Sequence, residues 1–488
     1  MDTDTESSQY DSNTNGLKTL LDKIYFHRLP SYGNTIFYGL GFLALTCLVL
    51  LAITGITLAF MGQHWWLFDP WGIYVRSFHL WAVQAFIFIL VLHGLVVFST
   101  SAFRKPRRMV WFFGAIIFCL VLIQTEFGYG LRGDFSSQFR AVSGADFWNG
   151  SYLGYWLNPL NYIQTFVIHT AIIPLAILLF FIAHYLLEHT YGIARPYRKD
   201  VAYTMEVADH RIMYLRGGTL VAVIAVFAFF FHSPYVPAVA IADIAKTNEP
   251  LVTTALLQEF DHTSGTATYL DSIDPYTFDT RKVYVISPYE AYRKSASGLF
   301  ASITPDAWQA FSSASPAAQA DYIAEAYQFA TSSDQHFYAT STNPVIDMLT
   351  TLTPMTRTGL YESILNSESP STNHTYSLRF LNDMDIPETK ARTLNMSTEQ
   401  WGMVKDETGS VWKLPPGSWW LAPLAIVNTI FNLPNQDTGD RTAAEILGLL
   451  MIIAVTFPYI PYLNRIPEHL HIAPWIWKHR RPNEKSDM

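Results

Sequence analysis

The sequence predicts an all-α integral membrane protein of about seven transmembrane helices, four of which form a bundle, together with an inserted soluble α+β domain. Charged residues make up only 15% of the 488 residues, against roughly 25% in soluble domains. A helix of about 20 apolar residues crosses a bilayer. Apolar stretches that reach or approach this length occupy residues 36–60, 77–98, 109–129, 163–186, 217–233, 418–433 (the shortest) and 445–463.

The positions of these stretches divide the chain into five parts. The first sixteen residues are polar and acidic and lack the regions of a signal peptide, so we expect a disordered tail. The following LKTLLDKIYFHRL fits an amphipathic helix on the membrane surface, with an ordinary terminal helix as the alternative. The predicted parts are 1–30, tail and surface helix; 31–200, four-helix bundle; 201–233, fifth transmembrane helix; 234–415, inserted domain; 416–488, last two helices and C-terminal tail.

Basic loops predict the orientation of the chain in the membrane. Short loops rich in Lys and Arg stay in the cytoplasm, and residues 103–108 (FRKPRR) and 194–200 (ARPYRKD) are two such loops. Residues 234–415, with 11 Lys and Arg against 21 Asp and Glu, then lie on the extracytoplasmic side. The basic stretch WKHRRP at 477–482 falls on the same outer side, against the rule.

The inserted segment combines helical and strand patterns. Residues 305–330 predict helix, with caps at Asp306 and Ser315, and RKVYVIS at 281–287 predicts a strand. Its scattered histidines form no metal-binding pattern, and it contains no cysteine. Two hypotheses remain open: an acidic surface that steers a basic electron carrier, and a docking or assembly domain without chemistry of its own.

Two of the apolar stretches each carry a pair of histidines. His79 and His93 are fourteen residues apart, and His169 and His184 are fifteen apart. In a helix these spacings return to nearly the same face, with the two rings of a pair about 21–22 Å apart along the axis. Pro174 in the fourth stretch can take up part of the extra rotation.

Matching pairs on two helices indicate two stacked bis-imidazole sites, one at each level. Imidazole is a common ligand of haem iron, whereas zinc needs three or four ligands at one level. A proton relay would need carboxylates, which these stretches almost lack. The chain has only two cysteines, Cys47 and Cys119, and each lies in an apolar stretch. This count excludes a Cys-rich zinc site, and we interpret both as packing residues. The alternative is separate structural histidines bonded to neighbouring helices.

Glycines and one arginine support the haem interpretation. Gly41 and Gly55 in the first stretch are fourteen apart, as are Gly114 and Gly128 in the third. A flat macrocycle between helices needs positions without side chains, although ordinary small-residue packing is the alternative. Arg76 precedes His79 by one turn and could bind a haem propionate, or simply extend to the membrane interface.

These motifs resemble the cytochrome b subunit of quinol-oxidising Rieske–cytochrome b complexes, most of all the plastoquinol–plastocyanin reductase branch. The resemblance rests on IFYGLGFLALTCLVLLAITG (36–55), RSFHLWAV and LHG (76–94), FRKPRRMVWFFGA (103–115), FGYGL (127–131), and HTAIIP with HYLLEH (169–189). It is firm over 32–190, and weaker over 200–233 and 416–470, which look like the three-helix partner subunit of that branch, here fused.

The resemblance implies two b-type haems, with His79 and His169 on the outer iron and His93 and His184 on the cytoplasmic-side iron. It implies quinol oxidation coupled to proton translocation in the plasma membrane of a prokaryote. The implied partners are a Rieske iron–sulfur protein and a cytochrome c or similar acceptor, in a homodimeric, lipid-embedded complex. No nucleic acid partner is expected.

Departures from the family leave the proton acceptor of the outer quinol site unassigned. Arg132 and Gly133 replace a Pro-Trp pair, and the Pro-Glu-Trp-Tyr motif is replaced by LPPGSWWLAP at 414–423, which lacks the carboxylate. Glu126 or Asp134 could accept the quinol proton instead. Gly39 stands where that branch attaches a third haem through cysteine, so no covalent haem is expected.

Two other functions remain open at this stage. One is a di-haem electron conduit between an extracytoplasmic redox partner and a cytoplasmic-side quinone, without division of electrons at an outer site. The other is a haem-free membrane scaffold or transporter. A cytoplasmic-side quinone site near His189, Arg198, Lys199 and Asp200 is expected from the family resemblance, with ordinary loop residues as the alternative.

Overall fold

The computed structural model describes residues 28–198, 201, 203–272, 279–296, 306–331, 341–368, 375–397, 401–407, 409–410 and 412–477. The predicted surface helix at 17–29 lies almost wholly outside these residues, as do Lys199 and Asp200. The chain forms two compact units: residues 1–123, 173–233 and 450–488, and residues 124–172 and 234–449. Each unit is described by itself.

Six helices among the described residues are long and apolar enough to cross a membrane. Five of these spans are α2 (Ile36–Met61), α4 (Pro70–Ser99), α5 (Arg108–Gly130), α9 (His210–Phe230) and the span that begins with α22 (Gly439–Thr456). The sixth, Tyr162–Tyr191, joins α7 (Tyr162–Val167), the π-helical turn η2 (Ile168–Ile172) and α8 (Ile173–Tyr191). The chain is therefore a multi-pass helical membrane protein, as the sequence predicts.

The stretch predicted as the sixth span is shorter than a membrane crossing. Its apolar helix covers only Trp419–Phe431, as the 3₁₀ turn η5 (Trp419–Leu421) and α21 (Ala422–Phe431). Asn432 ends it in the left-handed conformation with φ 51°. About 20 residues are needed to span the hydrocarbon core. The count of about seven spans is thus corrected to six for the described residues.

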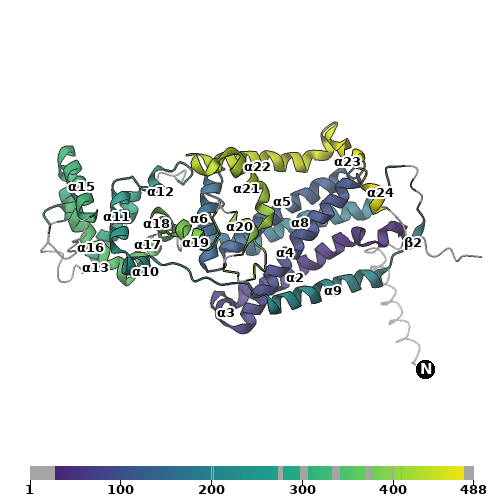
Figure 1. Ribbon diagram of the computed structural model, residues 1–488, viewed down its shortest axis with the longest axis horizontal. Helices are drawn as coiled ribbons and strands as arrows, with labels where there is room; N and C mark the ends of the chain where they lie inside the picture. Colours follow the sequence, from purple (N-terminus) through teal and green to yellow (C-terminus); the bar gives the residue numbers. More distant parts are fainter. Residues whose placement is uncertain are drawn as a thin grey trace, which may run out of the picture. The chain divides into compact units, whose positions relative to one another are not determined.

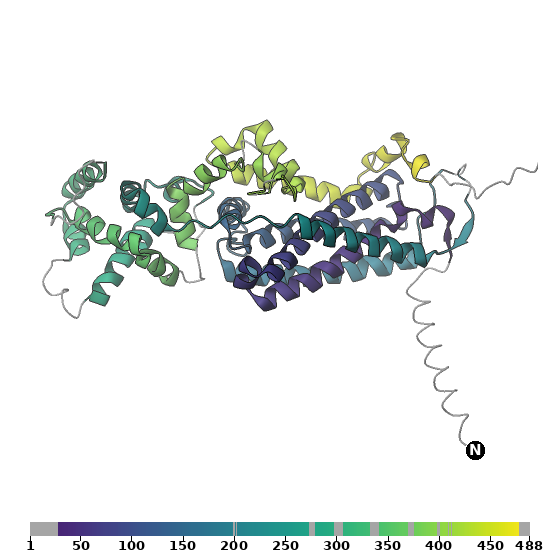
Figure 2. The same ribbon diagram turned by 60° about the horizontal axis from the view of Figure 1, so that its bottom comes forward.

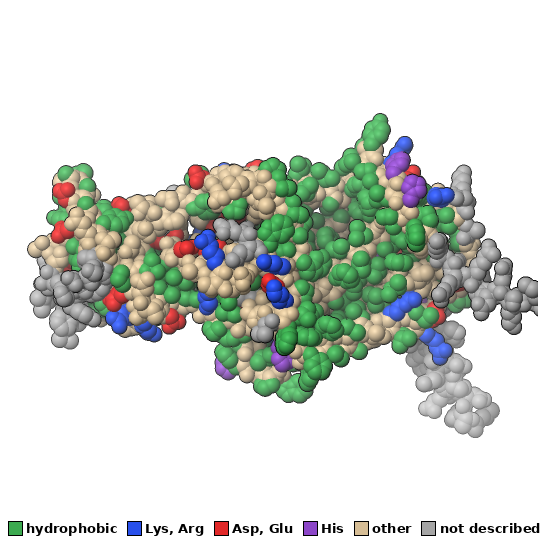
Figure 3. All heavy atoms as spheres, viewed as in Figure 1, with side chains coloured by type: hydrophobic (Ala, Val, Ile, Leu, Met, Phe, Trp, Pro, Cys, Tyr) green, Lys and Arg blue, Asp and Glu red, His purple; other side chains and the backbone are tan. Residues whose placement is uncertain are grey.

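In the first unit, α2, α4 and α9 lie side by side (Figures 1 and 2). Asp69 begins α4 by accepting hydrogen bonds from the backbone N–H groups of Trp71 and Gly72. The C-terminal end of α9 is fixed to α4 because the Trp81 indole donates to the Phe231 carbonyl at 2.9 Å. The long helices expose large apolar side chains, which cover much of the visible surface that they form (Figure 3). Such surfaces suit lipid.

The same unit contains short elements at the ends of the long helices. They are β1 (Arg28–Pro30), η1 (Ser31–Asn34), α3 (Gln63–Phe68), β2 (Met205–Val207), η7 (Phe457–Tyr459), η8 (Leu463–Arg465), α23 (Ile466–His469) and α24 (Ala473–Ile476). β1 and β2 pair antiparallel, with Arg28 opposite Val207.

In the second unit, helices of the inserted segment share a core with α6 (Phe135–Gly150). Ala141, Val142 and Ala145 of α6 are buried in the same cluster as Phe260 and Phe380. The helices of the segment are α10 (Ile241–Thr247), α11 (Glu249–Phe260), α12 (Gly265–Thr268), α13 (Ser287–Ala296), α14 (Ala307–Ser313), α15 (Pro316–Thr331), α16 (Pro344–Thr358), α17 (Leu360–Glu368), α18 (Thr375–Asp383), α19 (Ile386–Thr393) and α20 (Gly402–Lys405). A 3₁₀ turn, η6 (Leu433–Asn435), follows α21.

The strand predicted at 281–287 is wrong, because Lys282–Ile286 form the π-helical turn η3. A short apolar run does not distinguish a buried strand from a buried helix, and Tyr284 and Val285 are buried here in a helical core. The caps predicted at 305–330 are confirmed. Asp306 accepts from the Gln309 N–H at 3.3 Å, and Ser315 accepts from the Ala318 N–H at 3.3 Å.

Candidate functional site

Two of the four predicted histidines lie in the first unit against glycines. His93 of α4 lies beside Gly41 of α2, where an added Cβ would meet the imidazole Cε1 at 3.7 Å. His184 of α8 lies beside Gly114 of α5, where the corresponding distance is 3.0 Å. Both imidazoles therefore occupy space that side chains at the glycine positions would enter.

The other two histidines repeat this pairing, one in each unit. His79 of α4 faces Gly55 of α2, where an added Cβ would lie 3.3 Å from Cε1. His169 of η2 faces Gly128 of α5 in the second unit, at 2.6 Å. Each of the four glycines at fourteen-residue spacing, Gly41, Gly55, Gly114 and Gly128, thus meets a different one of the four histidines.

Hydrogen bonds set the protonation of two of these rings. His184 Nδ1 lies 2.9 Å from the Val110 carbonyl oxygen, and His169 Nδ1 lies 2.8 Å from the Gln124 carbonyl oxygen. A carbonyl only accepts, so Nδ1 carries the proton and donates. Nε2 then keeps its lone pair. This arrangement is typical of metal-ligating histidines, whose second ring nitrogen donates to a carbonyl or carboxylate.

His79 reaches the same tautomer through a hydroxyl group. Its Nδ1 lies 2.8 Å from Thr54 Oγ1. The Thr54 hydroxyl donates its own proton to the Leu50 carbonyl at 2.7 Å, so its oxygen accepts from His79 Nδ1. Three of the four imidazoles therefore present Nε2 as a Lewis base.

A local irregularity lies at the first histidine of the second pair. His169 lies in the π-helical turn Ile168–Ile172, immediately before α8. A π turn contains an extra residue relative to an α turn. The sequence predicts that Pro174 takes up part of the extra rotation, and the π turn is a second irregularity in the same span.

These features fit a planar iron macrocycle held by axial imidazoles. The rings lie at glycines that keep the helix surface bare, and Nε2 is the nitrogen with a lone pair on three of them. Arg76 is buried on α4, one turn before His79. Its contact with a propionate stays a prediction.

A polar cluster surrounds Glu126, near the C-terminal end of α5 in the second unit. The Trp420 indole donates to Glu126 Oε1 at 3.3 Å, and Arg140 Nη1 lies 3.4 Å from Oε2. The Arg140 guanidinium also lies 3.9 Å from the centroid of the Tyr129 ring. The Glu126 side chain is 30% exposed. The carboxylate is thus oriented by two donors and still reachable.

Arg140 has hydrogen-bonding capacity beyond this ion pair. Its side chain is only 3% exposed, and its Nε and Nη2 atoms have no hydrogen-bond partner among the described residues. A buried donor without a partner is costly. The cluster therefore offers buried donors beside a reachable carboxylate.

A second, fully buried ion-pair network lies next to the cluster. Arg132 pairs with Asp134 at 2.9 Å and with Glu407 of the inserted segment. The Tyr129 hydroxyl donates to Glu407 Oε2 at 3.2 Å. Burial works to lower the pKa of Arg132, but the carboxylates of Asp134 and Glu407 more than offset this, and its pKa is raised above the ordinary value.

The two carboxylates proposed from the sequence therefore have different environments. Asp134 is 1% exposed, pairs with Arg132, and caps α6 by accepting from the Ser137 N–H at 3.1 Å. These contacts already occupy Asp134, whereas Glu126 is partly exposed. Sequence reasoning missed Glu407 and Arg140, since the Arg132–Glu407 contact joins residues 275 positions apart and no local pattern marks it.

The fold and these sites define a multi-pass helical membrane protein with four histidines, each set against a glycine of a neighbouring helix. Residues 84–240 match the family described as "Cytochrome b(N-terminal)/b6/petB". Cytochrome b6 of Heliobacterium modesticaldum is 30% identical over 207 residues, which is 37% of this chain and 95% of that protein. Cytochrome b6 of Cyanothece is 25% identical over 205 residues, covering 37% and 90%.

The chain belongs to the cytochrome b family, whose members bind b-type haem, and is a cytochrome b subunit of a quinol-oxidising electron-transfer complex. The family match includes His93, His169 and His184. A solved structure titled "Hyperthermophilic respiratory Complex III" aligns over 73% of this chain and 97% of its own, with 15% identity and a TM-score of 0.39.

Proposed function

We propose that this chain binds two b-type haems and moves electrons across the membrane between quinone sites, coupled to proton translocation. The observation that carries the proposal is the one-to-one pairing of four histidines with four glycines. When bound, haem supplies reversible one-electron transfer at its iron. Within α4, the levels of His79 and His93 are about 21 Å apart along the axis, so the two sites would together cover much of the membrane.

The chain's own residues would orient each ligand. The carbonyls of Gln124 and Val110 and the hydroxyl of Thr54 hold the Nδ1 protons of His169, His184 and His79. Nε2 is then the only basic ring nitrogen in each case. Following the family resemblance, we assign His93 with His184 to the cytoplasmic-side iron and His79 with His169 to the outer iron.

We further propose that Glu126 accepts a proton from quinol at the outer site. The quinol O–H bond breaks, its proton bonds to a Glu126 carboxylate oxygen, and the electron pair of that bond stays on the quinol oxygen until oxidation. Arg140 would hold Glu126 and donate its remaining N–H groups to a quinol or quinone oxygen. Trp420 would fix the other carboxylate oxygen.

The proposed surroundings follow the sequence and the family. The partners would be a Rieske iron–sulfur protein and a cytochrome c or similar acceptor, in a homodimeric complex of a prokaryotic plasma membrane. Residues 234–415 would lie on the extracytoplasmic side. Because Gly39 has no thiol, no third haem would be covalently attached there.

The first test is haem stoichiometry on the purified complex, measured by alkaline pyridine spectroscopy. We expect two b-type haems per chain, one haem fewer in His184→Ala, and quinol-dependent reduction of both in the parent protein. One haem in the parent would contradict the two-site assignment. Two haems without quinol-dependent reduction would favour the conduit between an extracytoplasmic redox partner and a cytoplasmic-side quinone.

A second test separates the proton acceptor from the haem sites. Glu126→Gln keeps the side-chain shape but cannot accept the proton, so quinol oxidation should fall while haem content stays at two. Glu290→Gln is a matched control, since Glu290 pairs only with Lys294 at 3.6 Å on the surface of α13 among the described residues. Equal quinol oxidation in both variants would remove Glu126 from the mechanism.

A further inference from the structure

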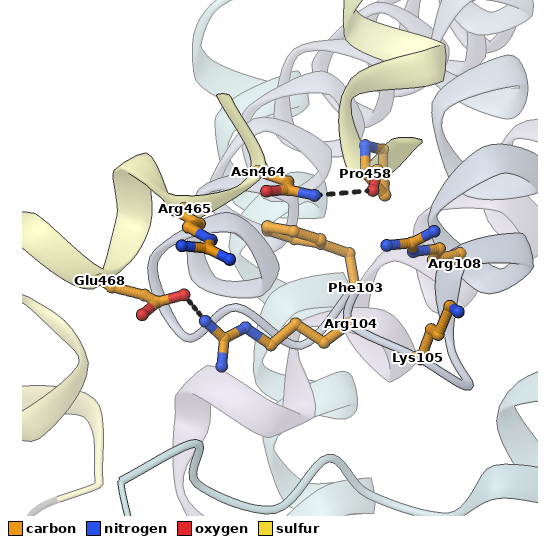
Figure 4. Close-up of a pocket in the computed structure, with 8 residues that line it drawn as sticks. All are labelled: Phe103, Arg104, Lys105, Arg108, Pro458, Asn464, Arg465 and Glu468. Carbon is orange, nitrogen blue, oxygen red and sulfur yellow. Dashed lines mark hydrogen bonds and ion pairs between the residues drawn. The ribbon is translucent and has the colours of Figure 1, made fainter. Parts of the chain in front are cut away.

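A basic pocket lies in the first unit, and none of the histidines and glycines described above lines it. It has a volume of about 520 Å³ and includes the basic side chains of Arg104, Lys105, Arg108 and Arg465 and the acidic side chain of Glu468 (Figure 4). Pockets of this size bind small molecules. Four cations against one carboxylate give the lining a net positive charge.

The pocket is built on a rigid aromatic base. Its loop follows α4, which ends at Ser99, and precedes α5, which begins at Arg108. Phe103 of this loop packs against Phe457 and Trp111, with ring centroids 5.3 Å and 5.4 Å apart. The Phe457 turn η7, with η8 and α23, supplies the opposite wall (Figure 4). The basic side chains are therefore held on a fixed base.

The positive charge is only partly compensated within the protein. Arg104 forms an ion pair with Glu468 and also lies over the Tyr197 ring. For Lys105 and Arg465, no ion pair occurs with any residue that the structure describes. Burial lowers the pKa of Arg104, and the neighbouring charge of Arg465 lowers it further. An anion in the pocket would relieve this repulsion.

The position of the pocket indicates which anion it meets. The loop joins two membrane-spanning helices, so it lies at the level of the phospholipid headgroups. Large apolar side chains are exposed on the same turns: Tyr462 is 85% exposed, Ile466 41% and Tyr459 43%. A free phosphate ion would use the charges alone, whereas a lipid would also cover these apolar side chains.

We propose that this pocket binds the phosphate group of an anionic phospholipid. Lys105, Arg108 and Arg465 would contact the phosphate oxygens, with Arg104 held at the edge by Glu468. The acyl chains would pass over the exposed apolar side chains of η7, η8 and α23. Basic pockets of this kind at the cytoplasmic side of membrane proteins bind anionic headgroups.

The test is native mass spectrometry of the delipidated complex, titrated separately with phosphatidylglycerol, phosphatidylcholine and inorganic phosphate in the same detergent. We expect phosphatidylglycerol to bind at least tenfold more tightly than phosphatidylcholine. Lys105→Gln/Arg465→Gln should weaken it about 30-fold, since each cation near an anionic surface contributes roughly fivefold. Lys246→Gln/Lys294→Gln, on exposed helices of the inserted segment, is the matched control and should bind like the parent.

A charge-conserving pair separates charge from folding. Lys105→Arg/Arg465→Lys should keep the affinity for phosphatidylglycerol, and an unchanged haem absorption spectrum confirms that each variant is folded. Equal affinity of the parent and the Lys105→Gln/Arg465→Gln variant would overturn the proposal. Inorganic phosphate that competes fully at equal concentration would overturn its lipid part, because the exposed apolar side chains would then contribute nothing.

Discussion

The pairing of glycines with histidines makes Gly128→Ala the sharpest test of the haem sites. The new Cβ would lie 2.6 Å from His169 Cε1. Carbon atoms pack at about 3.5–4.0 Å, so the ring must retreat by roughly 1 Å. Its 2.8 Å hydrogen bond to the Gln124 carbonyl would then exceed the ordinary range. The imidazole would lose both its position and its orientation.

The size of the effect follows from two costs. Moving the ring off its rotamer costs about 0.5–1.5 kcal/mol, and losing the hydrogen bond costs about 0.5–1.5 kcal/mol. Together these amount to about 1–3 kcal/mol, or about 5- to 150-fold in affinity for the group that the ring ligates. We expect Gly128→Ala to lose or shift one haem and to leave the other unchanged.

The other three glycines provide a graded series within the same protein. The corresponding distances from the added Cβ to the imidazole are 3.0 Å at Gly114, 3.3 Å at Gly55 and 3.7 Å at Gly41. The loss of haem affinity should therefore decrease in that order. Gly41→Ala makes only an ordinary contact with the imidazole, so it should displace the ring least of the four variants. Gly218→Ala in α9 is the control, since its Cβ would meet nothing within 4 Å.

The assay is haem content per chain, combined with a redox titration that resolves the two haems. Two haems with unaltered spectra and potentials in Gly128→Ala would refute the reasoning. So would a loss in Gly41→Ala as large as that in Gly128→Ala, because the effect would then not depend on the distance to the imidazole.

Four further predictions concern the second unit. Glu126→Gln should lower quinol oxidation by about 10²–10⁴-fold at unchanged haem content, as measured by steady-state kinetics. Glu407→Gln leaves Arg132 partly uncompensated and should cost about 3–5 kcal/mol, seen as a lower thermal midpoint than in Glu290→Gln. Asp306→Ala removes the α14 cap and should cost about 1 kcal/mol, seen as faster amide exchange confined to α14. Burial raises the pKa of Glu259 in the folded state, so stability should fall as pH rises from about 4.3 through the raised value. Glu259→Gln should abolish that slope in pH-dependent unfolding.

The positions of the histidines and glycines could be predicted because helical periodicity fixes them. Once residues 76–94 and 169–189 are taken as helices, spacings of fourteen and fifteen place each pair near one face. The structure adds that each glycine meets a particular imidazole. It also supplies the Nδ1 acceptors, of which two are backbone carbonyls and so leave no trace in side-chain chemistry.

The parts that could not be predicted depend on contacts between distant residues. Residues 281–287 carry β-branched and aromatic side chains, yet Tyr284 and Val285 are buried in a helical core, where the local preference for a strand has no partner strand. The 418–433 stretch is apolar but ends early at Asn432 in a left-handed turn. Arg140 and Glu407 have ordinary sequence neighbours, and their importance comes only from what they contact.

The contacts of Glu407 indicate that the inserted segment does more than dock a partner. Isolated burial of a carboxylate costs several kcal/mol, which only a close partner offsets, and this partner is Arg132, just after α5. The Tyr129 hydroxyl joins the same carboxylate, and its ring lies under Arg140, which holds Glu126. Because this chain of contacts lies within one unit, a change in the inserted segment that moves Glu407 would reach the proposed proton acceptor. Through Glu407, the inserted segment would therefore influence the position of Arg140 and Glu126 at the proposed outer quinol site.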